Sequence, residues 1–234
     1  DGAVCEGFDE SQPGGAGVSG PNAVKANEPI EKSFRMFGPD WFELPIFKRQ
    51  RWRLRFELRA LLSNRDSLDF GLHSIRNAQA VLADVFADST ELYGVIAWPM
   101  QASESRLLSE SLDYARYLRH RGIKVEPPFY SRAVASQYHQ DWATINLVAG
   151  RIDSSQAPLA ADPSINVEFA GGPKRAGWIH LVSFDRALIA NVYDHRGMDI
   201  IGLDFHRMKS IYQRHNALLS DFDRPTFDAL YGRQ

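Results

Sequence analysis

Apolar and charged residues alternate strictly along the segment RWRLRFELR, residues 51–59. Trp52, Leu54, Phe56 and Leu58 are apolar, and the other positions hold four arginines and one glutamate. Successive side chains of a β-strand point to opposite faces of a sheet. The period of two therefore predicts a strand with one buried face and one charged face.

Apolar residues recur at helical spacing in three further segments. The first, residues 67–86, predicts an amphipathic helix. The second is expected to run from about Ser103 to Gly122, and the third to follow an N-cap at Asp204. A last short helix is predicted to start at Asp223. The apolar stripes comprise Leu68, Leu72, Ile75, Leu82 and Phe86 in the first helix, Leu108, Leu112, Ala115 and Leu118 in the second, and Phe205, Met208, Ile211, Tyr212 and Leu218 in the third.

Three other segments have the composition of strands. The nearly continuous apolar run LYGVIAWP, residues 92–99, predicts a central strand, and DWATINLVAG, residues 141–150, is another candidate. Residues 178–194, WIHLVSFDRALIANVYD, contain two apolar runs on either side of Asp185 and Arg186. This arrangement predicts an antiparallel hairpin.

Glycine and proline interrupt the middle of the chain. Pro127 and Pro128 are expected to break it, and Gly171, Gly172 and Pro173 to form a loop. The elements run strand–helix–strand–helix, then mostly strands, and end with helices. This order predicts the α+β class, with a mixed, largely antiparallel sheet and packed helices.

The first 29 residues differ in composition from the rest. They are rich in Gly, Pro, Ser and acidic side chains and show no apolar periodicity. Such a segment buries too little apolar surface to offset the entropy of ordering it. We therefore expect residues 1–29 to be a disordered acidic leader and residues 30–234 to form a single domain.

Overall charge and cysteine content exclude several classes of protein. The formal net charge of −2 gives no global attraction to nucleic acid or to an anionic membrane. The only cysteine, Cys5, excludes an intrachain disulfide framework. No apolar run reaches the roughly 18–20 residues that span a bilayer. These features favour a cytoplasmic protein without membrane segments.

The segment VYDHRGMDIIG, residues 192–202, holds the densest group of polar candidates. Asp194 and Gly197 suit the ends of a type I turn, in which Gly197 takes a positive φ and closes a three-residue loop with a bulge. Alternatively, His195 acts as an acid or base oriented by a carboxylate, while Arg196 binds an anion. Turn preferences favour the structural interpretation.

The charged face of residues 51–59 is the second candidate. Arg53 and Arg55 lie about 7 Å apart on one strand face, close enough to bind a phosphate or a carboxylate together. The sequence favours pairing with carboxylates, and Asp194 and Asp199 are candidates. We therefore expect Arg196 and Asp199 to pair inward with the strand that contains Arg55 and Glu57.

Catalytic and metal-binding signatures do not emerge from the sequence. The seven histidines show no HExxH motif and no pairing with a nearby cysteine. No nucleotide-binding glycine loop and no GxSxG motif is present. We therefore predict no cofactor, no metal and no catalytic residue. The candidate interaction or fold-signature residues are Arg53, Arg55, Glu57, Asp194, His195, Arg196 and Asp199.

Two motifs resemble those of an uncharacterised bacterial family, a domain of unknown function. That family combines an LRFEL strand, here residues 54–58, with a C-terminal Tyr-Asp-Asp-Arg-Gly-x-Asp-Val-Ile segment, here residues 193–201. The resemblance extends over most of residues 40–232. One position departs from the family pattern, because His195 stands in place of its second Asp. A turn tolerates that change more easily than a catalytic carboxylate site would.

The resemblance implies a small bacterial protein of the kind found beside polymorphic toxins, where immunity proteins bind and block a toxin. The expected function is therefore a protein-binding module, most concretely an immunity protein that neutralises a toxin domain. The alternative is a phosphate-ester hydrolase or nuclease-like enzyme. In that case Arg53 and Arg55 bind the anion, and His195 with Asp194 or Asp199 supplies acid–base help.

Overall fold

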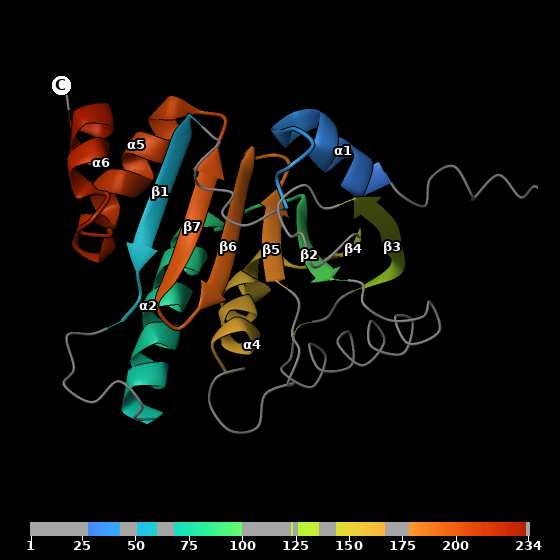
Figure 1. Ribbon diagram of the computed structural model, residues 1–234, viewed down its shortest axis with the longest axis horizontal. Helices are drawn as coiled ribbons and strands as arrows, with labels where there is room; N and C mark the ends of the chain where they lie inside the picture. The colour runs from blue at the N-terminus through green and yellow to red at the C-terminus, as the bar shows by residue number, and fades with distance from the viewer. Residues whose placement is uncertain are drawn as a thin grey trace, which may run out of the picture.

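Seven strands form one sheet in the computed structural model, which describes residues 28–42, 51–59, 68–99, 123, 126–135, 144–166 and 178–232. Their order across the sheet is β1-β7-β6-β5-β2-β4-β3, and each neighbouring pair is antiparallel (Figure 1). The strands are β1 (Trp52–Glu57), β2 (Leu92–Pro99), β3 (Glu126–Ala135), β4 (Thr144–Arg151), β5 (Trp178–Ser183), β6 (Leu188–Asp194) and β7 (Gly197–Gly202).

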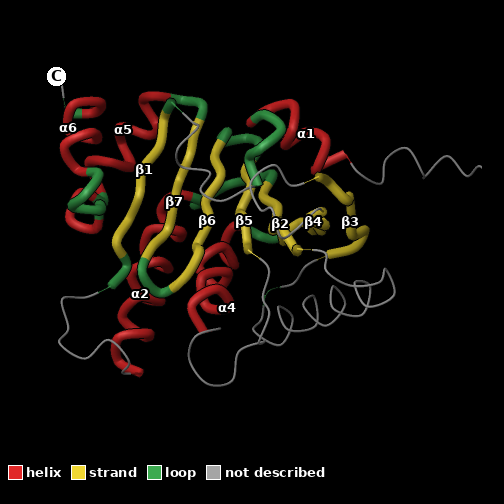
Figure 2. Tube along the Cα trace, in the orientation of Figure 1, coloured by secondary structure: helices red, strands yellow, loops and turns green. Residues whose placement is uncertain are grey.

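Helices cover both faces of this sheet (Figure 2). One face packs against α2, the η2–α4 segment, α5 and α6, and the other packs against α1. The predicted α+β class with a largely antiparallel sheet is confirmed. The helices are α1 (Glu28–Phe37), α2 (Leu68–Val85), η2 (Ser154–Ala160), α4 (Ala161–Asn166), α5 (Phe205–Arg214), η3 (Asn216–Leu218) and α6 (Arg224–Tyr231).

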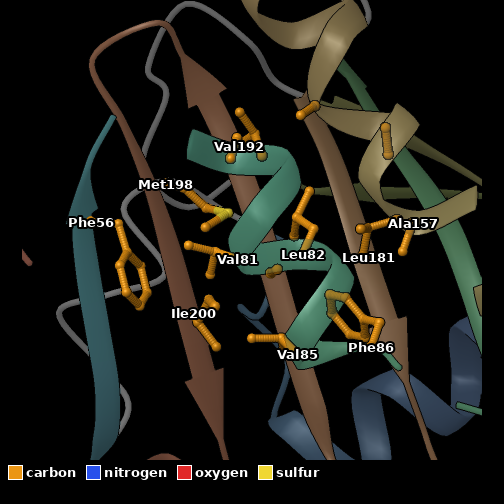
Figure 3. Packing of buried hydrophobic residues seen from close by; sticks show 14 of the residues in the cluster. Phe56, Val81, Leu82, Val85, Phe86, Ala157, Leu181, Val192, Met198 and Ile200 are labelled. Atoms are coloured by element: carbon orange, nitrogen blue, oxygen red, sulfur yellow. The ribbon is translucent and has the colours of Figure 1, made fainter. Parts of the chain in front are cut away.

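The larger core lies between α2 and the strands at the β1 end of the sheet (Figure 3). Val81 and Val85 of α2 are buried in the same cluster as Met198 and Ile200 of β7. The alternation in residues 51–59 is confirmed, because the apolar side of β1 enters this core. The prediction that Leu72 belongs to the buried stripe of this helix is wrong, because its side chain is 42% exposed. It lies near the start of α2, where the helix extends past the ends of the strands (Figure 1).

A second core lies on the opposite face, under α1. Ile30 and Phe37 of α1, with Trp41 and Phe42 just after it, cover apolar side chains of β2, β4 and β5. Trp41 and Phe42 make an edge-to-face ring contact at 5.9 Å between centroids. The sequence analysis did not predict α1, whose first residue, Glu28, lies within the segment expected to be a disordered leader.

The strand and hairpin predictions for residues 92–99, 141–150 and 178–194 are confirmed by β2, β4 and the β5–β6 hairpin. The expectation that Pro127 and Pro128 break the chain is wrong, since both lie inside β3. β3 is an edge strand with a register irregularity between Glu126 and Tyr130, and an edge tolerates residues that lack an N–H donor.

Asp204 caps α5 as predicted, because its side chain accepts a hydrogen bond from the Arg207 N–H. α6 follows Asp223, although the Asp223 side chain makes no capping bond. Among the described helices, none is long and apolar enough to cross a membrane. The predicted helix from Ser103 to Gly122, the loop at residues 171–173 and residues 1–27 of the predicted leader lie outside the described residues.

Candidate functional site

Four polar residues align across neighbouring strands on the α1 face of the sheet. Arg55 of β1 pairs in register with Asp199 of β7, Asp199 with Asn191 of β6, and Asn191 with His180 of β5. Asp199, Asn191 and His180 are fully or almost fully buried. Because directly opposed residues share a face of the sheet, the register alone places these polar groups in one continuous row.

Arg55 and Asp199 form a bidentate ion pair at the exposed end of this row. Arg55 Nε donates to Asp199 Oδ1 at 2.7 Å, and Nη2 donates to Oδ2 at 2.9 Å. The Asp199 side chain is 1% exposed and that of Arg55 is 26% exposed. Burial raises the pKa of Asp199, and the hydrogen bonds from Arg55 oppose that rise. The predicted inward pairing of Asp199 with the arginine strand is confirmed.

The turn between β6 and β7 contains only His195 and Arg196. Asp194 folds back on it, since Oδ1 accepts from the Arg196 N–H at 2.7 Å and Oδ2 accepts from Arg196 Nε at 2.8 Å. The Arg196 guanidinium binds Asp194 within the turn, and its predicted pairing with charged groups of β1 stays a prediction. The main chain of Arg196 also joins β1, since the Leu58 N–H donates to the Arg196 carbonyl at 3.0 Å.

Gly197 serves the turn differently from the prediction. Among the described glycines only Gly38 has a positive φ, so Gly197 does not provide a left-handed residue. Instead, a Cβ at Gly197 would meet the Tyr193 ring and the Phe56 carbonyl oxygen at 2.9 Å. The register shifts between Val192 and Asp194, which leaves Tyr193 as the extra residue of a bulge. The close approach of the Tyr193 ring and the Phe56 carbonyl oxygen therefore explains why this position is glycine.

An open depression of about 650 Å³ lies over this part of the sheet. Five of the seven predicted residues line it, whereas Arg53 and His195 are not among its lining residues. Tyr193 is placed there by the bulge, and Phe222 by the segment that follows η3. The predicted residues that line the depression are Arg55, Glu57, Asp194, Arg196 and Asp199, and the others are Phe56, Arg59, Trp178, Tyr193, Ser220, Phe222 and Asp223.

Aromatic side chains were missed by the sequence analysis. Phe222 is 92% exposed, which is unusual for so large an apolar side chain. Tyr193 and Trp178 line the same depression from β6 and β5. The sequence offered one signal for Phe222, an isolated aromatic residue between two aspartates in SDFDRP. It offered none for the position of that residue beside β1.

Each arginine among the described lining residues has a carboxylate partner within the depression. Besides the Arg55–Asp199 and Arg196–Asp194 pairs, Arg59 Nη2 lies 2.6 Å from Glu57 Oε1. No group of three or more His, Cys, Asp or Glu in the described part of the chain could hold a metal ion.

The structure thus defines an α+β protein with a polar, aromatic-edged depression on an antiparallel sheet. A model of the family described as a domain of unknown function (DUF3885) matches residues 30–223, and the chain belongs to this family. Comparisons with curated proteins and with solved structures give no match.

Proposed function

We propose that this protein is a protein-binding module, and specifically an immunity protein that binds and neutralises a toxin domain. The observation that carries the proposal is Phe222, an almost fully exposed aromatic side chain at the rim of a polar depression. Aromatic residues beside well-packed pockets supply much of the binding energy at protein interfaces. The resemblance to bacterial proteins found beside toxins supports the more specific assignment.

The ion pairs of the depression favour binding over catalysis. In the alternative phosphate-ester hydrolase, Arg53 and Arg55 would hold the anion, but both charged hydrogen bonds of Arg55 described above go to Asp199. His195, the acid–base candidate, does not line the depression. Rigid paired charges instead give an interface geometric specificity at a small entropic cost on binding.

Co-purification with a defined partner tests the proposal. The tagged protein is co-expressed with the product of the neighbouring gene, which the proposal requires to contain a toxin domain, and the affinity of the retained complex is measured by calorimetry. We expect Phe222→Ala to weaken binding by about thirtyfold, in line with loss of an interface hot spot.

Leu203→Ala is the matched control, because Leu203 is 43% exposed and does not line the depression. It should leave the affinity unchanged. A toxin domain that is not retained at all would contradict the proposed function. Equal losses in the two variants would contradict the assignment of the binding surface.

A further inference from the structure

Carboxylates outnumber guanidinium groups in the depression. Four carboxylates, those of Glu57, Asp194, Asp199 and Asp223, face three arginines, Arg55, Arg59 and Arg196. The first three carboxylates each bind one arginine. The formal charge of the described lining residues is therefore negative by one, and the carboxylate without an arginine in these pairs is that of Asp223.

Asp223 forms no salt bridge within 4 Å among the described residues. Its Oδ2 is buried without a hydrogen-bond partner, and its side chain does not cap α6 although it directly precedes that helix. It lies close enough to Arg55 and Asp199 for its charge to act on both. A carboxylate that lacks a hydrogen-bonded cation in a partly desolvated site is stabilised by a further cation that can reach it.

Aromatic rings complete a surface suited to a cation. Phe222, Tyr193 and Trp178 line the same depression as Asp223. Ring faces attract ammonium and guanidinium groups, and the attraction grows when the cation is desolvated. The protein already contains such a contact here, because the Arg55 guanidinium carbon lies 5.9 Å from the centroid of the Tyr193 ring.

We propose that the depression receives an arginine or lysine side chain of the partner protein, with Asp223 as the acceptor and Phe222 against the aliphatic stem. This inference rests on the proposed binding function and adds the chemistry of the partner. An anionic group, such as a phosphate, would meet the excess negative charge. It would also have to displace Asp199 from Arg55.

A titration of the full chain with small probes tests the inference. Capped arginine (N-acetyl-L-arginine amide), capped lysine and inorganic phosphate are each added to ¹⁵N-labelled protein, and amide and indole resonances are followed by NMR. We expect both capped cations, but not phosphate, to shift the Trp178 indole and the amides near Phe222. The change Asp223→Asn should weaken the binding of capped arginine about three- to fivefold.

Asp221→Asn is the matched control. It removes the same charge two residues away, from a side chain that is 87% exposed, does not line the depression and pairs with Arg224. It should leave the affinity for capped arginine unchanged. Should Asp223→Asn lower the thermal stability, Phe222→Ala replaces it as the test variant, because truncating an almost fully exposed side chain leaves the core intact.

Three results would overturn the inference: no shift with either cation, shifts with phosphate alone, or equal weakening by Asp223→Asn and Asp221→Asn. In each case a toxin domain that is still retained in co-purification would leave the proposed binding function standing. Conversely, the depression could bind capped arginine while the protein retains no toxin domain. That result would refute the proposed immunity function and leave the cation site standing.

Discussion

Asp199, which lies in the motif of residues 193–201, stabilises the fold through a buried ion pair. Its carboxylate is almost fully buried, and both oxygens accept hydrogen bonds from Arg55, 144 residues away in the sequence. The pair joins β1 to β7 and forms part of the floor of the depression. Losing one partner leaves the other charge without compensation in a poorly hydrated site, which costs more than the pair itself contributes.

Asp199→Asn is therefore expected to lower the free energy of unfolding by about 2–4 kcal/mol, less than for a fully buried pair because Arg55 keeps some contact with water. Urea denaturation at pH 7 measures the change. The double change Arg55→Met with Asp199→Leu should recover most of the loss, because it leaves no buried charge unpaired. A double variant as unstable as the sum of its single changes would refute this account.

At the scale of elements, β1 is an edge strand whose outer backbone groups are covered by the C-terminal segment. The Tyr231 hydroxyl of α6 accepts from the Arg53 N–H at 2.9 Å and donates to the Arg53 carbonyl at 3.2 Å. The Ser220 N–H donates to the Arg55 carbonyl at 2.9 Å, and Leu219 forms a bridge with Phe56. An exposed edge would offer these groups to other chains.

Tyr231→Phe should lower the free energy of unfolding by about 1–2 kcal/mol, because Arg53 loses both of its edge partners while the aromatic packing is kept. Hydrogen exchange of the Arg53 amide should accelerate. Tyr212→Phe provides the comparison, because it removes a hydroxyl that donates to Asp228 of α6 at 2.6 Å. An unchanged Arg53 exchange rate in Tyr231→Phe would contradict the role assigned to this hydroxyl.

Local patterns predicted the elements whose causes are local. Alternation identified β1, and the apolar runs around Asp185 identified the β5–β6 hairpin. The prediction failed for Pro127 and Pro128, because whether a proline is tolerated depends on whether its strand lies at an edge. The position of a strand in the sheet order is set by contacts distant in sequence.

For the whole molecule, the sequence predicted the fold class and part of the site. The pairing of Arg55 with Asp199 could be proposed from sequence because both residues lie in charged motifs. Their register, however, depends on the pairing of β1 with β7, two strands far apart in the sequence. The segment containing Phe222 and Asp223 reaches the depression only because η3 and α6 pack beside β1. No local pattern encodes that placement.

One buried histidine, His180, is expected to make the stability of the whole protein depend on pH. His180 lies fully buried in the sheet under α1, with its ring 5.4 Å from that of Trp41. Burial lowers the pKa of His180 from 6.5 to about 3. In the unfolded chain the imidazole regains its ordinary pKa, so between these values the unfolded state binds more protons than the folded state. His180 therefore contributes a loss of folded-state stability as the pH falls from about 6.5 toward 3.

Between pH 7 and pH 4.5 this single group should remove about 2–3 kcal/mol of the free energy of unfolding. The His180→Leu variant cannot take up this proton. Its free energy of unfolding should therefore decline by about 2–3 kcal/mol less than that of the unmodified protein over the same pH interval. Urea denaturation at the two pH values gives the comparison. His73→Gln removes an exposed imidazole from α2 and should decline as the unmodified protein does. Parallel declines in the unmodified protein and His180→Leu would show that acid acts elsewhere in the molecule.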